Sequence, residues 1–174
     1  MKIRADLHVN GGHRKLVLVP GENEKDEHLA LKLAAYLLFW DLDLVVDASV
    51  KHPALLGQDY RPDLLGVDPS GSVGAWVECG NTTLNKLFKA LRRWPSARVV
   101  VLKEDPPRAR RIRADLEREI AGSQRVEVLA FPEGVFGRWR ALPDERTEVY
   151  GEAGGLSFNM VVNEQIFLAD LVRV

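Results

Sequence analysis

Two carboxylates and one lysine in the middle of the chain have the residue types and spacing of a hydrolytic metal site: Asp63, Glu78 and Lys86. Mg²⁺ prefers carboxylate oxygens and keeps several waters, so two protein acids and a substrate phosphate suffice to hold it. The metal lowers the pKa of a bound water, and a lysine adds positive charge near the attacking oxygen. We therefore expect metal-assisted hydrolysis to be the chemistry of this stretch, provided that the three side chains meet.

The turn between the two acids decides whether they meet. Residues 68–72 are all turn-forming and separate two apolar stretches, which predicts an antiparallel hairpin. If the loop is residues 69–72, Asp63 lies opposite Glu78, with Cβ atoms roughly 4.5–5.5 Å apart. A register that differs by one residue would turn the two carboxylates to opposite faces of the sheet.

A strongly apolar helix is predicted before this hairpin, over residues 24–40, with Asn23 as its cap and acids in its first turn. It is apolar on nearly every side from Leu29 to Trp40, so we expect it to pack against a sheet and to be covered again. Glu27 precedes Leu31 by one turn and either points toward the acid pair or remains a solvated acid.

The other elements follow from apolar periodicity and turn residues. A hairpin is predicted around residues 10–13. Lys86 falls in the first turn of an amphipathic helix, where its positive charge opposes the helix dipole, so we expect a carboxylate nearby to compensate it. The further expected strands are 44–50, 62–68, 73–79, 97–102, 126–131, 148–150, 156–162 and 166–172, and the further helices are 83–94 and one that runs from 106 to 122. Beyond residue 132 the helical periodicity is lost, so only strands are expected there.

Length and composition limit the kinds of protein that this chain can be. The 174 residues carry a net charge of −1, which signals neither nucleic acid binding nor membrane attachment in bulk, and their number favours one domain over 1–174. The single cysteine, Cys79, excludes an intrachain disulfide, and the four histidines are too scattered for a zinc site, so we expect surface or satisfied core histidines. The first residues lack the apolar core of a signal peptide, and no apolar run spans a bilayer, so a cytoplasmic location without a membrane partner is expected.

The predicted order of elements, αβββαβ, resembles the core of the PD-(D/E)XK nuclease superfamily, with Pro62-Asp63 matching its "PD" and Glu78 its "(D/E)". Three stretches also resemble the bacterial YaeQ family: DEHLALKLAAYLLFWD, LLGVDPSGSVGAWVECG and AGGLSFNMVVNEQIFLADLV. The resemblance implies an α/β fold with a restriction-endonuclease-like core, in which helices flank a central mixed sheet and antiparallel strands are added at both termini.

The resemblance also implies roles for the residues. Asp63 and Glu78 would hold Mg²⁺ or Mn²⁺, but the lysine that normally follows the second acid by two positions is replaced by Gly80. Lys86 is the candidate for a migrated catalytic lysine, and Glu27 is the candidate for the helix-borne acid of some members, with Glu24 as the weaker choice.

Three functions remain open from the sequence. The first is a metal-dependent nuclease that hydrolyses phosphodiesters in nucleic acid, and the second is an inactive nuclease fold that binds nucleic acid or a protein partner. The third treats both acids as surface residues of a structural domain. Basic side chains that offer contacts to nucleic acid are Lys86, Lys89, Arg92, Arg93, Arg108, Arg110 and Arg111. Arg138, Trp139 and Arg140 either stack on bases or pack against the C-terminal strands, and we expect packing.

Overall fold

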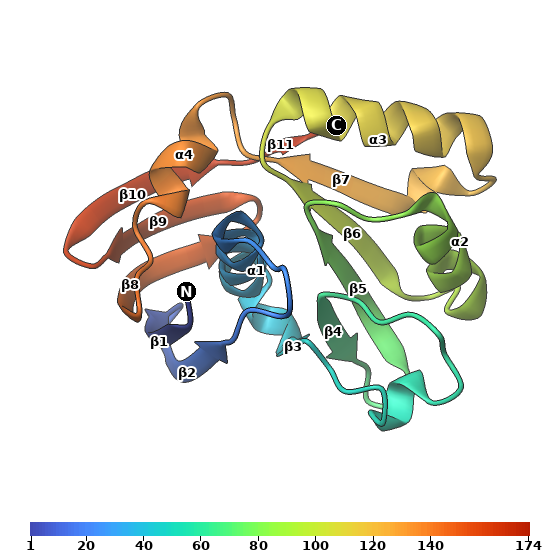
Figure 1. Cartoon of the computed structure of the whole chain (residues 1–174), viewed down its shortest axis with the longest axis horizontal. Coiled ribbons are helices and arrows are strands. Elements are labelled where there is room, and N and C mark those ends of the chain that lie inside the picture. Colours follow the sequence, from blue (N-terminus) through green and yellow to red (C-terminus); the bar gives the residue numbers. More distant parts are fainter.

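The chain forms a mixed α/β fold of two mixed sheets and four helices in a computed structural model that describes residues 1–174 (Figure 1). Sheet A has the order β10-β9-β8-β1-β2, and sheet B has the order β11-β7-β6-β5-β4-β3. The strands of sheet A are β1 (Ile3–Val9), β2 (Gly12–Leu18), β8 (Arg146–Gly154), β9 (Ser157–Val162) and β10 (Gln165–Asp170). Those of sheet B are β3 (Val45–Val46), β4 (Leu64–Val67), β5 (Val73–Cys79), β6 (Arg98–Lys103), β7 (Val126–Ala130) and β11 (Val172–Arg173).

The terminal strands differ from the expected antiparallel additions to one central sheet. They form a sheet of their own, and β1 runs parallel to β8, which brings the first strand of the chain beside residues 146–151, whereas the last strand, β11, pairs with β7 in sheet B. The physical reason is the helix α1 (Asp26–Leu38), which is buried at every position from Leu29 to Leu38 because sheet A covers one side and sheet B the other (Figure 1). No helix combines the length and apolar composition that a bilayer crossing requires.

Three element predictions need correction. The helix α1 begins at Asp26, because Asn23 has a φ of 64° and turns the chain instead of capping it. The predicted strand 44–50 shrinks to β3, since Asp47 takes a φ of 49° and leaves the sheet. The short helix α4 (Val135–Arg140) was missed, because six residues are too few to display a helical period.

The hairpin register at the two acids is the predicted one. Leu64 pairs with Val77, and the next pair outward places Asp63 opposite Glu78. The turn itself is one residue longer than predicted, because Val67 pairs with Val73. A bulge absorbs the difference at Gly74, where a Cβ atom would lie 3.2 Å from the Cβ of Asp68.

The helices α2 (Leu84–Arg93) and α3 (Pro106–Glu119) cover the face of sheet B that α1 leaves open. Both are capped by side chains: the hydroxyl of Thr83 accepts from Lys86 N, and the carboxylate of Asp105 accepts from Arg108 N. Because α2 directly follows β5, the chain carries Lys86 back toward the acids of the hairpin.

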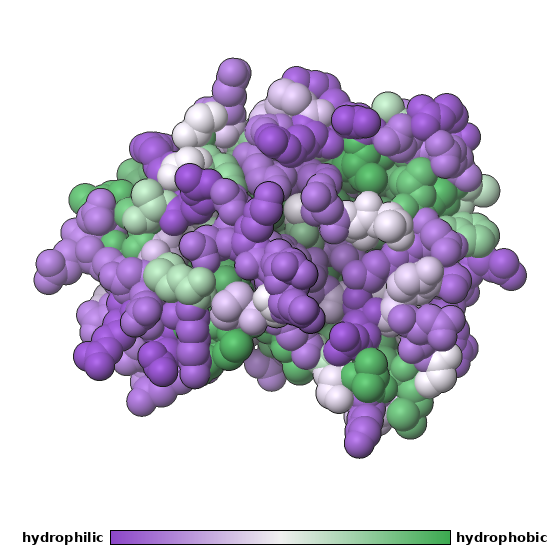
Figure 2. Space-filling model, in the orientation of Figure 1, coloured by the Kyte–Doolittle hydropathy of each residue, from purple (hydrophilic) through white to green (hydrophobic).

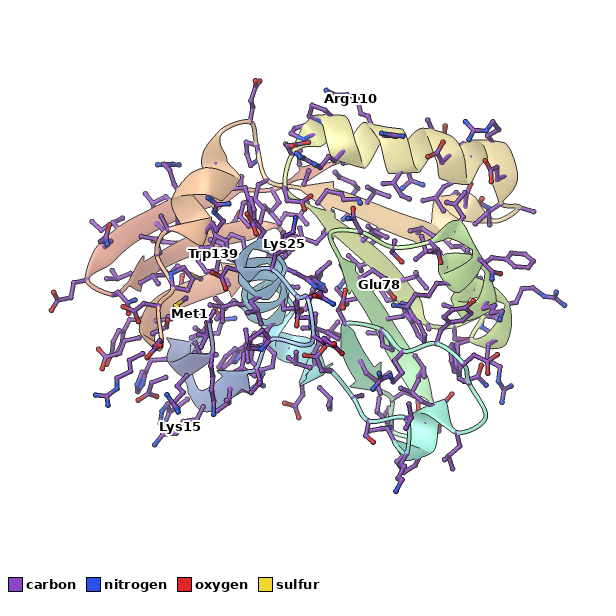
Figure 3. The ribbon with its side chains drawn as sticks, in the orientation of Figure 1. Met1, Lys15, Lys25, Glu78, Arg110 and Trp139 are labelled. Carbon is purple, nitrogen blue, oxygen red and sulfur yellow. The ribbon has the colours of Figure 1, made fainter.

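Trp139 of α4 packs inside the molecule, as predicted (Figure 3). Its indole Nε1 donates to the carbonyl of Ala30 at 2.8 Å, and its ring lies against Phe131, Phe158 and Phe167 with centroids 5.0–6.5 Å away. This aromatic cluster ties α1 to sheet A.

We expect Trp139→Ala to lower the free energy of unfolding by about 3–5 kcal/mol, because it removes a fully buried ring and leaves a cavity beside α1. Urea denaturation followed by circular dichroism measures the change, and Phe88→Ala, at an exposed position on α2, is the control with an expected loss below about 1 kcal/mol. Equal losses for the two variants would contradict the structural role of the cluster.

Candidate metal centre

A pocket of about 610 Å³ opens where the N-terminal end of α1 meets the edge of sheet B. Its walls come from the segment before α1, the turn after β3, residues 59–63, the cap of α2 and Lys86. Four acids line it: Glu24, Asp47, Asp59 and Asp63. The surface around this end of α1 is mostly hydrophilic (Figure 2). An open, polar pocket of this kind suits a charged substrate better than an apolar ligand.

Asp63 directly precedes β4 and lines the pocket. Its Oδ2 accepts from the backbone N of Cys79 at 2.7 Å and lies 3.2 Å from Nε2 of His28. Burial acts to raise the pKa of Asp63, but the hydrogen bond and charge of His28 prevail and hold that pKa below its usual value. Asp63 is therefore ionised at neutral pH.

Glu78 lies on the face of β5 that is turned toward α2 and is only 1% exposed (Figure 3). Its Oε1 accepts from Nε1 of Trp76 at 2.7 Å, and its Oε2 accepts from Nζ of Lys86 at 2.8 Å. Burial raises the pKa of Glu78 to about 7, against the opposing charge of Lys86. The expected compensation of Lys86 by a carboxylate is thus present, and Glu78 sits behind the pocket, with Lys86 between it and solvent.

Glu27 does not join the acids. Its Oε1 is bound by Arg140 at 2.5 Å, and its side chain is 41% exposed. Because α1 starts at Asp26, Glu27 is only its second residue and faces α4, whereas Glu24 lies before the helix and turns back into the pocket. The structure therefore places Glu24, the weaker of the two choices, beside Asp63.

Two further side chains of α1 belong to the site and were missed from the sequence. Lys32 is 3% exposed, and its Nζ lies 2.6 Å from both Glu24 Oε1 and Asp47 Oδ1. His28, expected to be a surface or satisfied core residue, bridges Glu24 and Asp63, with Nδ1 2.8 Å from Glu24. The signal for Lys32 was visible, because it is the only charged residue within an otherwise apolar helical run.

The backbone at residue 80 favours glycine. Gly80 has a φ of 68°, and a Cβ atom there would lie 3.4 Å from Oε1 of Glu104 and 3.4 Å from Cδ1 of Leu31. A side chain would therefore carry backbone strain in the left-handed region. Lys103, at the end of β6, donates its Nζ to the carbonyl of Gly80 at 2.5 Å, so a second lysine approaches the same strand end.

The residue types present suit a hard divalent cation, but no three of their carboxylate or imidazole ligand atoms lie within 4.8 Å of one another. Glu24, Asp47, Asp63 and Glu78 supply four carboxylates, and the bases in contact with them are Lys32, Lys86 and His28. Burial acts to lower the pKa of His28, but its contact with Asp63 prevails and raises that pKa. The buried Oε1 of Glu24 makes no well-aligned hydrogen bond, although Lys32 and His28 lie close to it. An excess of carboxylates over bases is what an oxygen-coordinated cation would relieve.

Glu78→Gln is expected to stabilise the fold above pH 7. The folded-state pKa of about 7 exceeds that of an unfolded glutamate, so ionisation of Glu78 destabilises the folded protein as the pH rises between the two values. The gain for the variant is about 2–3 kcal/mol near pH 8 and shrinks as the pH falls toward about 5. Urea unfolding at both pH values measures it, with Glu27→Gln as the exposed control. A variant less stable than the wild type at the higher pH would contradict the buried, partly protonated state of Glu78.

Comparison with known proteins assigns the chain to a family. A search of curated proteins finds no match. The structure of a YaeQ protein from Xanthomonas axonopodis pv. citri superposes with a TM-score of 0.75 at 20% identity, covering 99% of this chain and 96% of that one. A YaeQ protein from Pseudomonas syringae gives 0.71 at 15% identity, covering 99% and 93%. These likenesses concern the fold, whereas the YaeQ family pattern itself matches residues 13–149, and the chain therefore belongs to the YaeQ protein family.

Proposed function

We propose that this protein is a metal-dependent nuclease with a core of the PD-(D/E)XK type, which hydrolyses phosphodiester bonds in nucleic acid. The observation that carries the proposal is the hairpin register, which sets Asp63 opposite Glu78 at the end of the strand pair that α2 then covers with Lys86. The helix α1, the strands β3 to β5, the helix α2 and the strand β6 follow one another in the superfamily's order.

Asp63 and Glu78 would hold Mg²⁺ or Mn²⁺, with Glu24 as the third acid in reach of the pocket. When bound, the metal supplies an acidified water and stabilises negative charge on the phosphate. Lys86 Nζ stays beside Glu78 Oε2, where its positive charge favours ionised Glu78 and faces the pocket that admits the substrate. His28, held between Glu24 and Asp63, orients both carboxylates.

Basic side chains support nucleic acid as the substrate and divide into two groups. A second pocket, of about 240 Å³, is lined by Lys103, Arg108 and Arg111 and shares Asn81 with the first pocket. A backbone phosphate next to the one being cleaved would bind there through charge-assisted hydrogen bonds. Other cations expected to contact nucleic acid lie on α2: Lys89, Arg92 and Arg93.

Two other arginines of α3 lie outside this pocket. Arg110 lies on the outer side of the helix and points away from the sheet (Figure 3). Arg113 donates to the backbone carbonyls of Ser123, Val126 and Val174, so it holds the C-terminal end in place.

The second candidate function is a non-catalytic member of the same fold that binds nucleic acid or a protein. Two observations favour this second function. Glu24, Asp63 and Glu78 each already form an ion pair with a basic side chain. Gly80 stands at the position where the superfamily usually has its lysine. Calorimetry separates the two functions, since a binding module with its acids neutralised in this way takes up no Mg²⁺.

We expect the wild type to cleave fluorescently labelled DNA or RNA in millimolar Mg²⁺ or Mn²⁺ and to lose activity with a chelator. Asp63→Asn, Glu78→Gln and Lys86→Met should each reduce the rate by about 10²-fold or more, because each removes a charge that acts on the reacting phosphate or its metal. Single-stranded and double-stranded substrates identify the preferred form.

Glu27→Gln and Lys51→Met are the matched controls for loss of an acid and of a lysine, and both should cleave at the wild-type rate. Absence of both cleavage and calorimetric Mg²⁺ binding would rule out the nuclease. Undiminished cleavage by Lys86→Met would remove that lysine from the mechanism while leaving the metal ligands in place.

A further inference from the structure

The outward face of the β1–β2 hairpin carries a second set of metal-ligating side chains, on the other sheet from the acid pocket. Asp6, His8 and His13 are the only trio of His, Cys, Asp or Glu side chains whose ligand atoms all lie within 4.8 Å of one another. Their side chains are 42%, 38% and 50% exposed, so an ion reaches them directly from solvent. The histidines looked scattered in the sequence, but the hairpin register sets His8 directly opposite His13.

The imidazole rings are held in place by stacking. His8 lies between His13 and Tyr150, with ring centroids 4.3 Å and 4.6 Å away and interplanar angles of 6° and 5°. Tyr150 occupies the neighbouring position on β8, paired with His8 in the parallel register. Because three strands fix these rings side by side, the two histidines lose little freedom when they bind a ligand.

The ligand atoms converge on one carboxylate oxygen. Nε2 of His13 is in direct hydrogen-bond contact with Oδ1 of Asp6, and Nε2 of His8 lies 3.5 Å from the same oxygen. Ligands at about 2.0–2.1 Å from a tetrahedral zinc ion are roughly 3.3 Å from one another. The His8–Asp6 separation of 3.5 Å is close to this value. The His13–Asp6 pair must open as the metal replaces the proton that the two share, and the stacked rings must tilt so that both Nε2 lone pairs point at the ion.

We propose that Asp6, His8 and His13 form a surface site for Zn²⁺, with the fourth coordination position open to water. Two imidazoles and one carboxylate favour a late first-row cation over Mg²⁺, whereas the carboxylates of the acid pocket have the opposite preference. The site joins β1 to β2 across the hairpin, so the bound ion stabilises the edge of sheet A. Lys15, directly opposite Asp6, places a positive charge beside the site and weakens cation binding.

The test is isothermal titration calorimetry with ZnCl₂, using the full chain with Asp63→Asn and Glu78→Gln so that the acid pocket does not contribute. We expect one equivalent of Zn²⁺ to bind, and His8→Ala and His13→Ala each to weaken binding by at least about tenfold, since each removes a direct ligand. Lys15→Met should tighten binding. His52→Ala, a histidine outside the hairpin, is the matched control and should leave the affinity unchanged.

Two measurements exclude trivial explanations. Circular dichroism establishes that each variant is folded, and His13→Gln is used if His13→Ala is not. Imidazole resonances of His8 and His13 in NMR spectra should shift with ZnCl₂ and stay in place with MgCl₂. Zn²⁺ affinity that is the same in the wild-type hairpin and in both histidine variants, or no Zn²⁺ binding at all, would overturn the proposal, whatever the nuclease assays give.

Discussion

The need to bury α1 on all sides is the constraint on which the rest of the structure depends. One sheet is enough to bury the apolar face of an ordinary amphipathic helix, but in α1 every residue from Leu29 to Leu38 is buried. A second sheet must therefore cover it, and the two ends of the chain supply that sheet through the parallel pairing of β1 with β8. Trp139 of α4 adds a further contact to α1, because its indole Nε1 donates to the carbonyl of Ala30.

The charged end of this buried helix is also what builds the pocket. Lys32 follows His28 by one turn, so both face the edge of sheet B where Asp63 enters β4. Burying ionisable groups costs free energy unless each finds a partner. The pocket meets that condition by alternating acids and bases, yet it keeps an excess of carboxylates and raises the pKa of Glu78 to about 7.

Two glycines adjust the backbone to this arrangement. The bulge at Gly74 lets a longer turn coexist with the register that pairs the acids. Gly80, in the left-handed region, redirects the chain after β5 toward the cap of α2. The same turn that disfavours a side chain at residue 80 leads into α2, which brings Lys86 onto Glu78.

The sequence by itself determined the elements with strong local patterns: the hairpin register at Asp63 and Glu78, the buried character of α1 and the compensated Lys86. Periodicity, turn residues and helix caps act over a few residues, so they can be read without knowledge of the packing. Only the tertiary structure decided that Glu24 rather than Glu27 faces the pocket, because this choice depends on where α1 begins and how it is rotated between two sheets. The same holds for the second sheet itself and for the meeting of His8 with Tyr150, which are 142 residues apart and adjacent only through strand pairing.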